Sequence, residues 1–306
     1  MINKVYPIQI EGSQPYARLT VYIQEHYEEI GIDHRPLVLI CPGGAYAYTS
    51  PREGEAYAMQ FLSFGYHAAV LNYSCAPSVY PTALTELALS VAMIRGHAEE
   101  WHVASDRIVV MGSSAGGHLA ASLGVFWQEA FLGESVKRLL SGQEGAEEGA
   151  GEGKSCGKNA VCKGPESQDF IQEMLRPDGM ILCYPVITSG EYAHRGSFEN
   201  LLGDREEELT PSMSLEMQVS DKTPPAFLWH TFTDDAVPVE NSLLFVSALR
   251  RAGVSTEFHM YPRGGHGLGL ANRLTATRDG NAMQEECTSW ITLAHTWMEN
   301  RFVKGI

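Results

Sequence analysis

Short apolar runs alternate along the chain with longer segments whose apolar residues recur with the helical period. The runs are rich in Val, Ile, Leu and aromatic residues, as in strands that are buried on both faces. They fall at 36–41, 67–74, 107–112, 179–185, 226–232 and 256–262. The helical segments fall at 54–64, 81–101, 115–127, 239–252 and 280–302. This alternation predicts an α/β fold with a mostly parallel central sheet covered by helices on both faces.

Two further segments depart from this alternation. Residues 4–12 and 17–25 are joined by a polar turn, and we expect them to form an antiparallel pair at the sheet edge. Residues 141–169 are rich in Gly, Glu and Lys and have hardly any large apolar side chains. Such a composition cannot offset the entropy cost of ordering, so we expect a disordered surface insertion, or alternatively an acidic tether for a partner. The rest predicts a single domain over 1–306.

The composition and charge of the chain disfavour some classes of binding partner and indicate a cellular compartment. The formal net charge of −15 disfavours a nucleic-acid or anionic-membrane partner, since either requires clustered Lys and Arg. We identify no secretory signal and no membrane span, and the six scattered cysteines then predict a cytoplasmic protein with reduced thiols. Cys156 and Cys162 lack a second pair at zinc-site spacing, so no metal site is expected.

The segment VMGSSAGGHL contains the pattern G-x-S-x-G, with Gly112, Ser114 and Gly116 at its fixed positions. The pattern lies between a predicted strand and a predicted helix, the setting of a nucleophile elbow. Glycines remove Cβ atoms where such a turn is crowded and leave the serine hydroxyl exposed above the sheet. We therefore predict Ser114 as the nucleophile, whereas Ser113 lies one position early and faces elsewhere.

A serine hydroxyl needs a base to take its proton and a carboxylate to orient that base. Of the eleven histidines, His266 is the candidate base, because it lies in the glycine-rich segment RGGHGLG just past the last predicted strand. His118 is one helical turn beyond Ser114 and is expected to pack, and His259 lies within a strand.

Asp234 and Asp235 both follow the strand 226–232, at the sheet edge where open α/β sheets collect functional groups. We prefer Asp234 as the carboxylate, with Asp235 as a cap for a helix beginning near Val237. The loop 42–46, PGGAY, follows the strand 36–41 and can offer backbone N–H groups to an oxyanion, as can Ala115 directly after the nucleophile.

As a set, these motifs resemble the α/β-hydrolase esterases related to acetyl-xylan and feruloyl esterases, near the hormone-sensitive-lipase group. The matching segments are CPGGAY, REGEAYA, LNYSCAP, RIVVMGSSAGGHLAA, RPDGMILCYPVI, TPPAFLWHTFTDDAVPV and GGHGLG. The resemblance implies an α/β-hydrolase fold and hydrolysis of short-chain esters, acetyl above all, of carbohydrate alcohols such as xylo-oligosaccharides. It implies an acyl-enzyme and no metal or organic cofactor.

The resemblance also bears on individual residues. It assigns the oxyanion donors to Gly44 and Ala45, beside Ala115, although Pro42 stands where many relatives have histidine. Its D-x-x-V-P spacing selects Asp234 over Asp235.

Two alternatives stay open: an amidase, formamidase or peptidase with the same residues, and a non-catalytic binding protein of this fold. The expected partner is a small-molecule or oligosaccharide ester in an open cleft that residues 188–222 partly roof. Tyr46, Tyr48 and Tyr73 are candidates for stacking on a sugar ring, with packing as the alternative for each.

Overall fold

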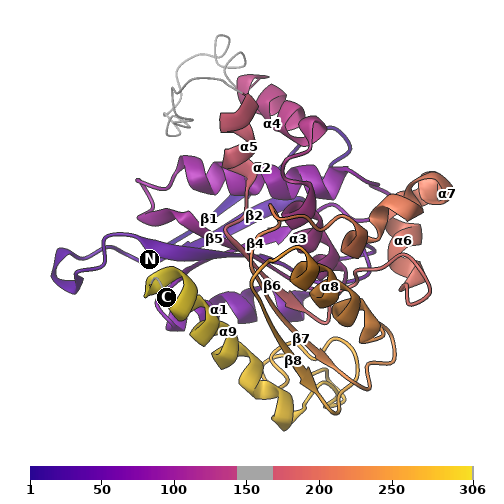
Figure 1. Cartoon of the computed structure of the whole chain (residues 1–306). Helices are drawn as coiled ribbons and strands as arrows, with labels where there is room; N and C mark the ends of the chain where they lie inside the picture. The colour runs from indigo at the N-terminus through magenta and orange to yellow at the C-terminus, as the bar shows by residue number, and fades with distance from the viewer. Residues whose placement is uncertain (143–167, 305–306) are drawn as a thin grey trace.

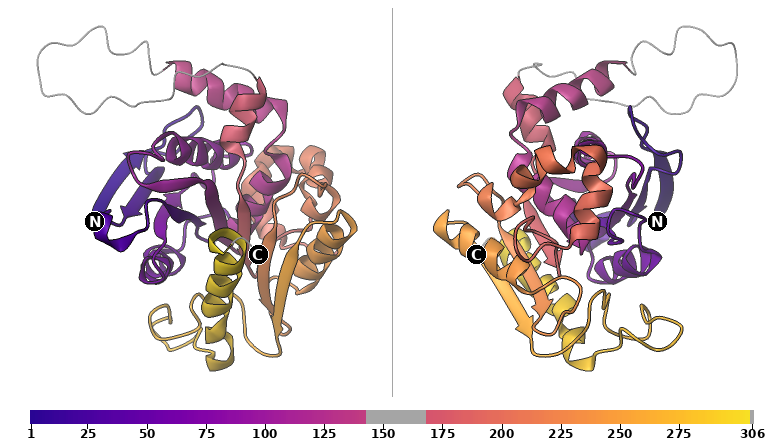
Figure 2. Two further views of the ribbon diagram at one scale, coloured as in Figure 1. Left: turned by 60° about the vertical axis from the view of Figure 1, so that its left-hand side comes forward. Right: turned by 90° about the vertical axis from the view of Figure 1, so that its right-hand side faces the viewer.

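The alternating pattern folds into one sheet, whose strands run in the order β1-β2-β4-β3-β5-β6-β7-β8 (Figure 1). The computed structural model describes residues 1–142 and 168–304. The strands are β1 Ile2–Pro7, β2 Arg18–Ile23, β3 Arg35–Cys41, β4 His67–Asn72, β5 Val103–Ser113, β6 Gly179–Cys183, β7 Ala226–Thr231 and β8 Thr256–Tyr261. From β4 to β8 all neighbours are parallel, whereas β2 pairs antiparallel with β1 and β4. The predicted antiparallel edge pair and parallel sheet are confirmed, with β1 and β8 at opposite edges (Figure 2).

Helices cover both faces of this sheet. The helices α1 (Glu55–Ser63) and α9 (Trp290–Met298) pack on one face. On the other face pack α2 (Thr82–Gly96), α3 (Ala115–Phe126) and α8 (Glu240–Arg251). Further helices are α4 Ala130–Gly142, α5 Gln168–Leu175, α6 Arg195–Leu202 and α7 Glu206–Leu209. Short turns of helix lie at Glu28–Ile30 (η1), Pro51–Glu53 (η2), Gly203–Arg205 (η3), Thr210–Met213 (η4), Leu215–Met217 (η5), Glu285–Ser289 (η6) and Glu299–Val303 (η7).

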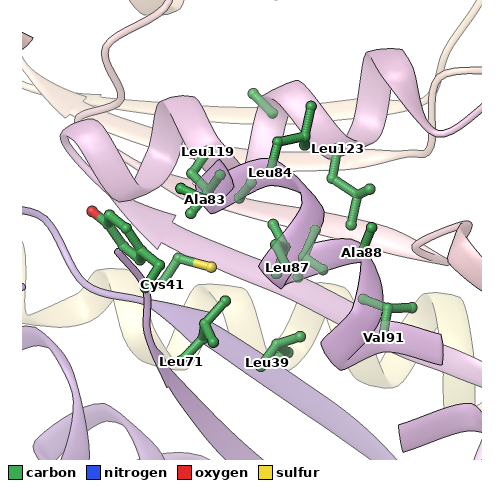
Figure 3. Close-up of a cluster of buried hydrophobic side chains, with 14 of the residues drawn as sticks. Leu39, Cys41, Leu71, Ala83, Leu84, Leu87, Ala88, Val91, Leu119 and Leu123 are labelled. Carbon is green, nitrogen blue, oxygen red and sulfur yellow. The ribbon is translucent and has the colours of Figure 1, made fainter. Parts of the chain in front are cut away.

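The two faces of the sheet explain why its strands are apolar throughout. Successive side chains of a strand point to opposite faces, so Leu37 and Leu39 of β3 join the core under α2 and α3. Val38 and Ile40 join the separate core under α1 and α9. Figure 3 shows the first core, with Leu39 on the sheet side and the residues of α2 and α3 on the other. Both faces of the central strands are therefore mostly apolar, with a few buried polar side chains such as His67 and His230.

The predicted strands and most of the predicted helices agree with the observed ones to within a few residues, but the helix predicted over 81–101 ends at Gly96 and a turn follows it. The segment 280–302 is wrong as one helix, because η6 precedes α9 and residues 280–284 are turn and coil. The helices α4 to α7 were not predicted. Residues 141–142 end α4 and residues 168–169 begin α5, so the expected insertion 141–169 was drawn too wide. The rest of that prediction, with Cys156 and Cys162, lies outside the described residues.

The parallel strands place their carboxyl ends at one edge of the sheet. The loops that leave β3, β5, β7 and β8 there carry the residues that the sequence nominates. Among the described residues, no helix combines the length and apolar composition needed to cross a bilayer.

Truncating Leu87 tests the core under α2. Leu87 is fully buried, and its replacement in Leu87→Ala leaves a cavity, so the free energy of unfolding should fall by about 3 kcal/mol. Leu243→Ala is the control, because Leu243 is 44% exposed on α8, and it should cost less than about 1 kcal/mol. Urea unfolding measures both. Equal losses would mean that this core does not support the fold as the structure indicates.

Candidate active site

Ser114 occupies the sharp turn between β5 and α3. Its backbone angles, φ 54° and ψ −120°, lie in a region that residues other than glycine rarely adopt. A Cβ on Gly112 would lie 1.9 Å from the carbonyl oxygen of Gly116, and one on Gly116 would lie 2.1 Å from that of Cys41. Both glycines of the motif are therefore required by close backbone approach.

Three of the sequence-predicted residues meet above this turn. The hydroxyl of Ser114 lies 2.7 Å from Nε2 of His266, and Nδ1 of His266 lies 2.8 Å from Oδ2 of Asp234. A proton on Nδ1 satisfies the carboxylate and leaves Nε2 free to accept the proton of the serine hydroxyl. The ring of Tyr184 packs edge-on against that of His266, with 5.2 Å between centroids. The arrangement can raise the nucleophilicity of the serine oxygen.

The carboxylate of Asp234 is held by donors on both oxygens. Oδ1 accepts the N–H groups of Ala236 and Val237, and Oδ2 accepts from His266 and, at 3.3 Å, from His230. Burial by itself raises the pKa of Asp234, but the hydrogen bonds from His230 and His266 outweigh it and hold that pKa well below its ordinary value. Asp234 therefore carries a negative charge at neutral pH.

The interpretation of Asp235 as a helix cap is wrong. The helix α8 begins at Glu240, and the amides of the preceding turn are accepted by Asp234 instead. Asp235 is exposed. Sequence reasoning also missed His230, a fully buried residue of β7 that bonds the hydroxyl of Ser242 and the carbonyl of Val237. No local pattern marks it, because its partner Asp234 is brought to it by the turn after β7.

The predicted oxyanion donors lie beside Ser114. In residues 1–142 and 168–304, the N–H groups of Gly44, Ala45 and Ala115 have no hydrogen-bond acceptor. Ala115 opens α3, so its amide has no partner within the helix. A Cβ on Gly44 would lie 2.1 Å from the carbonyl oxygen of Tyr48, which explains the glycine. These amides can bind an anionic oxygen that forms next to the serine.

A cavity of about 170 Å³ opens at this point. It is lined by Gly44, Ala45, Tyr48, Ser50, Arg52, Glu53, Ser114, His194, His266 and Gly267. Tyr48 is 60% exposed and free to meet a ligand, whereas the expectation of stacking is wrong for the buried Tyr46 and Tyr73. Within the described ranges, no cluster of three or more His, Cys, Asp or Glu side chains is placed to bind a metal ion.

The oxyanion loop is held by buried hydrogen bonds that involve Tyr46, Tyr73 and His118. The hydroxyl of Tyr73 donates to the carbonyl of Pro42, and that of Tyr46 bonds Nδ1 of His118 at 2.9 Å. Burial lowers the pKa of His118 to about 4, so the ring is neutral at pH 7. His118 packs, as expected.

His194 was not foreseen. It precedes α6, lines the cavity and bonds the hydroxyl of Ser197 through Nδ1. Burial lowers its pKa, and the nearby His266 lowers it further. From the same helix, the amide of Asn200 donates to the carbonyl of Ala45. The segment 188–222 thus contributes one wall of the cavity.

Comparison with known proteins finds a matching family model and similar curated proteins. The model of the BD-FAE family matches residues 21–249. The chain is 37% identical over 244 residues to endo-1,4-beta-xylanase B of Butyrivibrio fibrisolvens, covering 78% of this chain and 33% of that protein. It is 27% identical over 236 residues to the acetylxylan esterase of Xylanibacter ruminicola, covering 75% and 40%. The chain thus spans less than half the length of either relative.

A solved structure extends over nearly the whole chain. The acetyl ester-xyloside bifunctional hydrolase of Caldicellulosiruptor lactoaceticus superposes with a TM-score of 0.72 and 32% identity, covering 94% of this chain and 89% of that one. The expected α/β-hydrolase fold is confirmed.

Substituting Gly112 tests the elbow. In Gly112→Ala the new methyl group meets the Gly116 carbonyl oxygen, so the free energy of unfolding should fall by about 2 kcal/mol or more. Gly96→Ala is the matched control, because a Cβ at the end of α2 meets nothing within 4 Å and should stabilise by about 0.5 kcal/mol. Urea unfolding compares the two variants. Similar effects of the two would contradict the close approach at the elbow.

The charge of Asp234 makes stability depend on pH. Because its folded pKa is lowered, its contribution is present above the unfolded pKa of about 4 and is lost as the pH falls toward the folded one. In Asp234→Asn the new NH2 group replaces one carboxylate oxygen and meets N–H donors. The free energy of unfolding of this variant should therefore be about 2 kcal/mol below that of wild type at pH 7. That difference should narrow below pH of about 4.

Urea unfolding from pH 7 to pH 3.5 measures this difference, with Asp235→Asn as the control at the exposed neighbouring position. If the difference in free energy of unfolding between wild type and Asp234→Asn stays constant over this pH range, Asp234 is not the ionised carboxylate that the hydrogen bonds indicate.

Proposed function

The chain belongs to the BD-FAE family, and on that premise we propose that it is a serine carboxylic-ester hydrolase that removes acetyl groups from carbohydrate alcohols such as xylo-oligosaccharides. One observation carries the proposal: Ser114, His266 and Asp234 form a hydrogen-bonded chain at a cavity that Gly44 and Ala45 line, and the amides of these two residues and of Ala115, directly after the nucleophile, are unpaired. This is the set of groups that acyl transfer through a serine requires.

Acylation begins when Nε2 of His266 takes the proton of Ser114 and Oγ attacks the ester carbonyl. The ionised Asp234 stabilises the imidazolium that forms. The carbonyl oxygen becomes an anion and accepts the N–H groups of Gly44, Ala45 and Ala115, each stabilising the transition state by about 3 kcal/mol. The tetrahedral intermediate collapses, and His266 returns the proton to the alcohol as it leaves.

Deacylation repeats these steps with water. His266 takes a proton from the water, the hydroxide oxygen attacks the acetyl carbon on Ser114, and the same amides stabilise the second oxyanion. Acetate then leaves, and Ser114 regains its proton from His266.

The shape of the site supports a small acyl group and a polar alcohol. A cavity of about 170 Å³ suits acetyl better than a long chain. Tyr48 is exposed at its border and can stack on a sugar ring. The relatives named for acetylxylan and acetyl ester-xyloside hydrolysis support the same substrate class.

The proposal includes a cytoplasmic location, where the enzyme would deacetylate oligosaccharides after their uptake. Cys41, Cys75, Cys183 and Cys287 are free and buried, as is usual in a reducing compartment.

Removal of the nucleophile tests the function. Wild-type protein should hydrolyse p-nitrophenyl acetate and release acetate from acetylated xylo-oligosaccharides, and Ser114→Ala should lower kcat about 10³-fold or more. Ser113→Ala is the matched control, since the buried hydroxyl of Ser113 faces that of Tyr57 at 3.4 Å, and its kcat should stay within about threefold of wild type. Absorbance of p-nitrophenol and mass spectrometry of the oligosaccharides give the two readouts.

Other outcomes would redirect or reject the proposal. Faster cleavage of an acetanilide than of the matched phenyl acetate would favour an amidase. No turnover by folded wild type, or equal turnover by Ser114→Ala, would exclude Ser114 as the nucleophile.

A further inference from the structure

The buried carboxylate of Glu53 joins two loops of the site, although the mechanism above does not use it. Glu53 ends the short turn η2 and is 3% exposed. Its Oε2 accepts the N–H of Gly43 at 2.8 Å, within the loop that offers the oxyanion amides. Its Oε1 accepts the hydroxyl of Tyr184 at 2.5 Å.

Tyr184 extends the connection to the loop of His266. While its hydroxyl donates to Glu53, the same oxygen accepts the N–H of Gly269 at 3.0 Å. Its ring also packs against the ring of His266. The hydroxyl and the ring of one side chain therefore both contact the segment that carries the general base.

Arg52, next to Glu53, holds that segment at two more points. Its guanidinium donates to the carbonyls of Gly267 and Thr275, at 2.9 Å and 2.5 Å. Arg52 and Glu53, which are adjacent in the sequence, thus bond both the oxyanion loop, through Gly43, and the loop after β8.

The contacts of Glu53 also determine which amides remain for substrate. Because the N–H of Gly43 is taken by the carboxylate, the next amides, of Gly44 and Ala45, are the ones that face the cavity unpaired. Hydrogen bonds to a carboxylate are short and strong, and burial strengthens them. Both partners of Glu53 donate, so no neutral side chain of the same shape can satisfy both.

We propose that Glu53 is a positioning residue, which fixes the oxyanion amides and His266 relative to each other through Gly43 and Tyr184. The inference rests on the proposed function, because it assigns to Glu53 the geometry that ester hydrolysis needs. Misplacement of reacting groups by about 1 Å can lower a rate about 100-fold.

Glu53→Gln tests the proposal with p-nitrophenyl acetate. The amide group of glutamine meets a donor, so kcat should fall about 100-fold while KM stays within about threefold. Glu86→Gln is the matched control: Glu86 is also a buried carboxylate with two partners, but its partners are Ser13 and Ser74, which belong neither to the oxyanion loop nor to the loop of His266. Its kcat per folded molecule should stay within about threefold of wild type, with near-UV circular dichroism giving the folded fraction.

Tyr184→Phe provides a second variant, which keeps the bond from Gly43 to Glu53 and removes the bonds of the tyrosine hydroxyl to Glu53 and to Gly269. Its kcat should fall about tenfold, and the double variant should lose less than the product of the two single losses. Wild-type kcat in Glu53→Gln, or in Tyr184→Phe if Glu53→Gln does not fold, overturns the inference. So does an equal loss in Glu86→Gln. A wild-type protein without esterase activity would instead overturn the proposed function.

Discussion

The close backbone approach at the turn between β5 and α3 is the constraint on which the rest of the site depends. Because Gly116 has no side chain, the first turn of α3 can lie against the carbonyl groups of Cys41 and Pro42 at the end of β3. That contact brings the free amide of Ala115 next to the loop that carries Gly44 and Ala45. N–H donors from the segments that follow β3 and β5 thus lie close together, and neither segment alone provides the full set.

Two buried carboxylates complete this geometry, and each is surrounded by donors. Asp234 accepts from two backbone amides and two histidines, and Glu53 accepts from an amide and a tyrosine. Removal from water is unfavourable for both, and their hydrogen bonds offset that cost. The difference lies in the partners: Asp234 bonds two histidine side chains, whereas Glu53 bonds a backbone amide and a tyrosine hydroxyl that belong to two different parts of the site.

Features that depend on short-range pattern were predictable from the sequence. The apolar runs predict the strands because both faces of the sheet are buried, and the elbow spacing singles out Ser114 because only glycine fits on either side. Asp234 and His266 follow from the rule that parallel strands end at one edge. Their contacts at 2.7 Å and 2.8 Å are properties of the folded chain.

Tertiary packing decides what the pattern left open. His230 meets Asp234 only because the chain turns back after β7, and His194 reaches the cavity only because the segment before α6 lies beside the loops of Ser114 and His266. Neither histidine has a signature in the local sequence. Tyr46 and Tyr73 precede or follow loops at the site, yet the structure turns both inward onto His118 and Pro42.

The helix α6 and the residue before it contact both the cavity and the oxyanion loop, so the width of the cavity and the position of that loop depend on each other. The amide of Asn200 in α6 donates to the carbonyl of Ala45, and His194, just before α6, lines the cavity. A shift of α6 that widened the cavity would therefore also move the peptide that offers an oxyanion donor. A wider cavity and a fixed Ala45 carbonyl are opposing demands on this one helix, because both depend on its position.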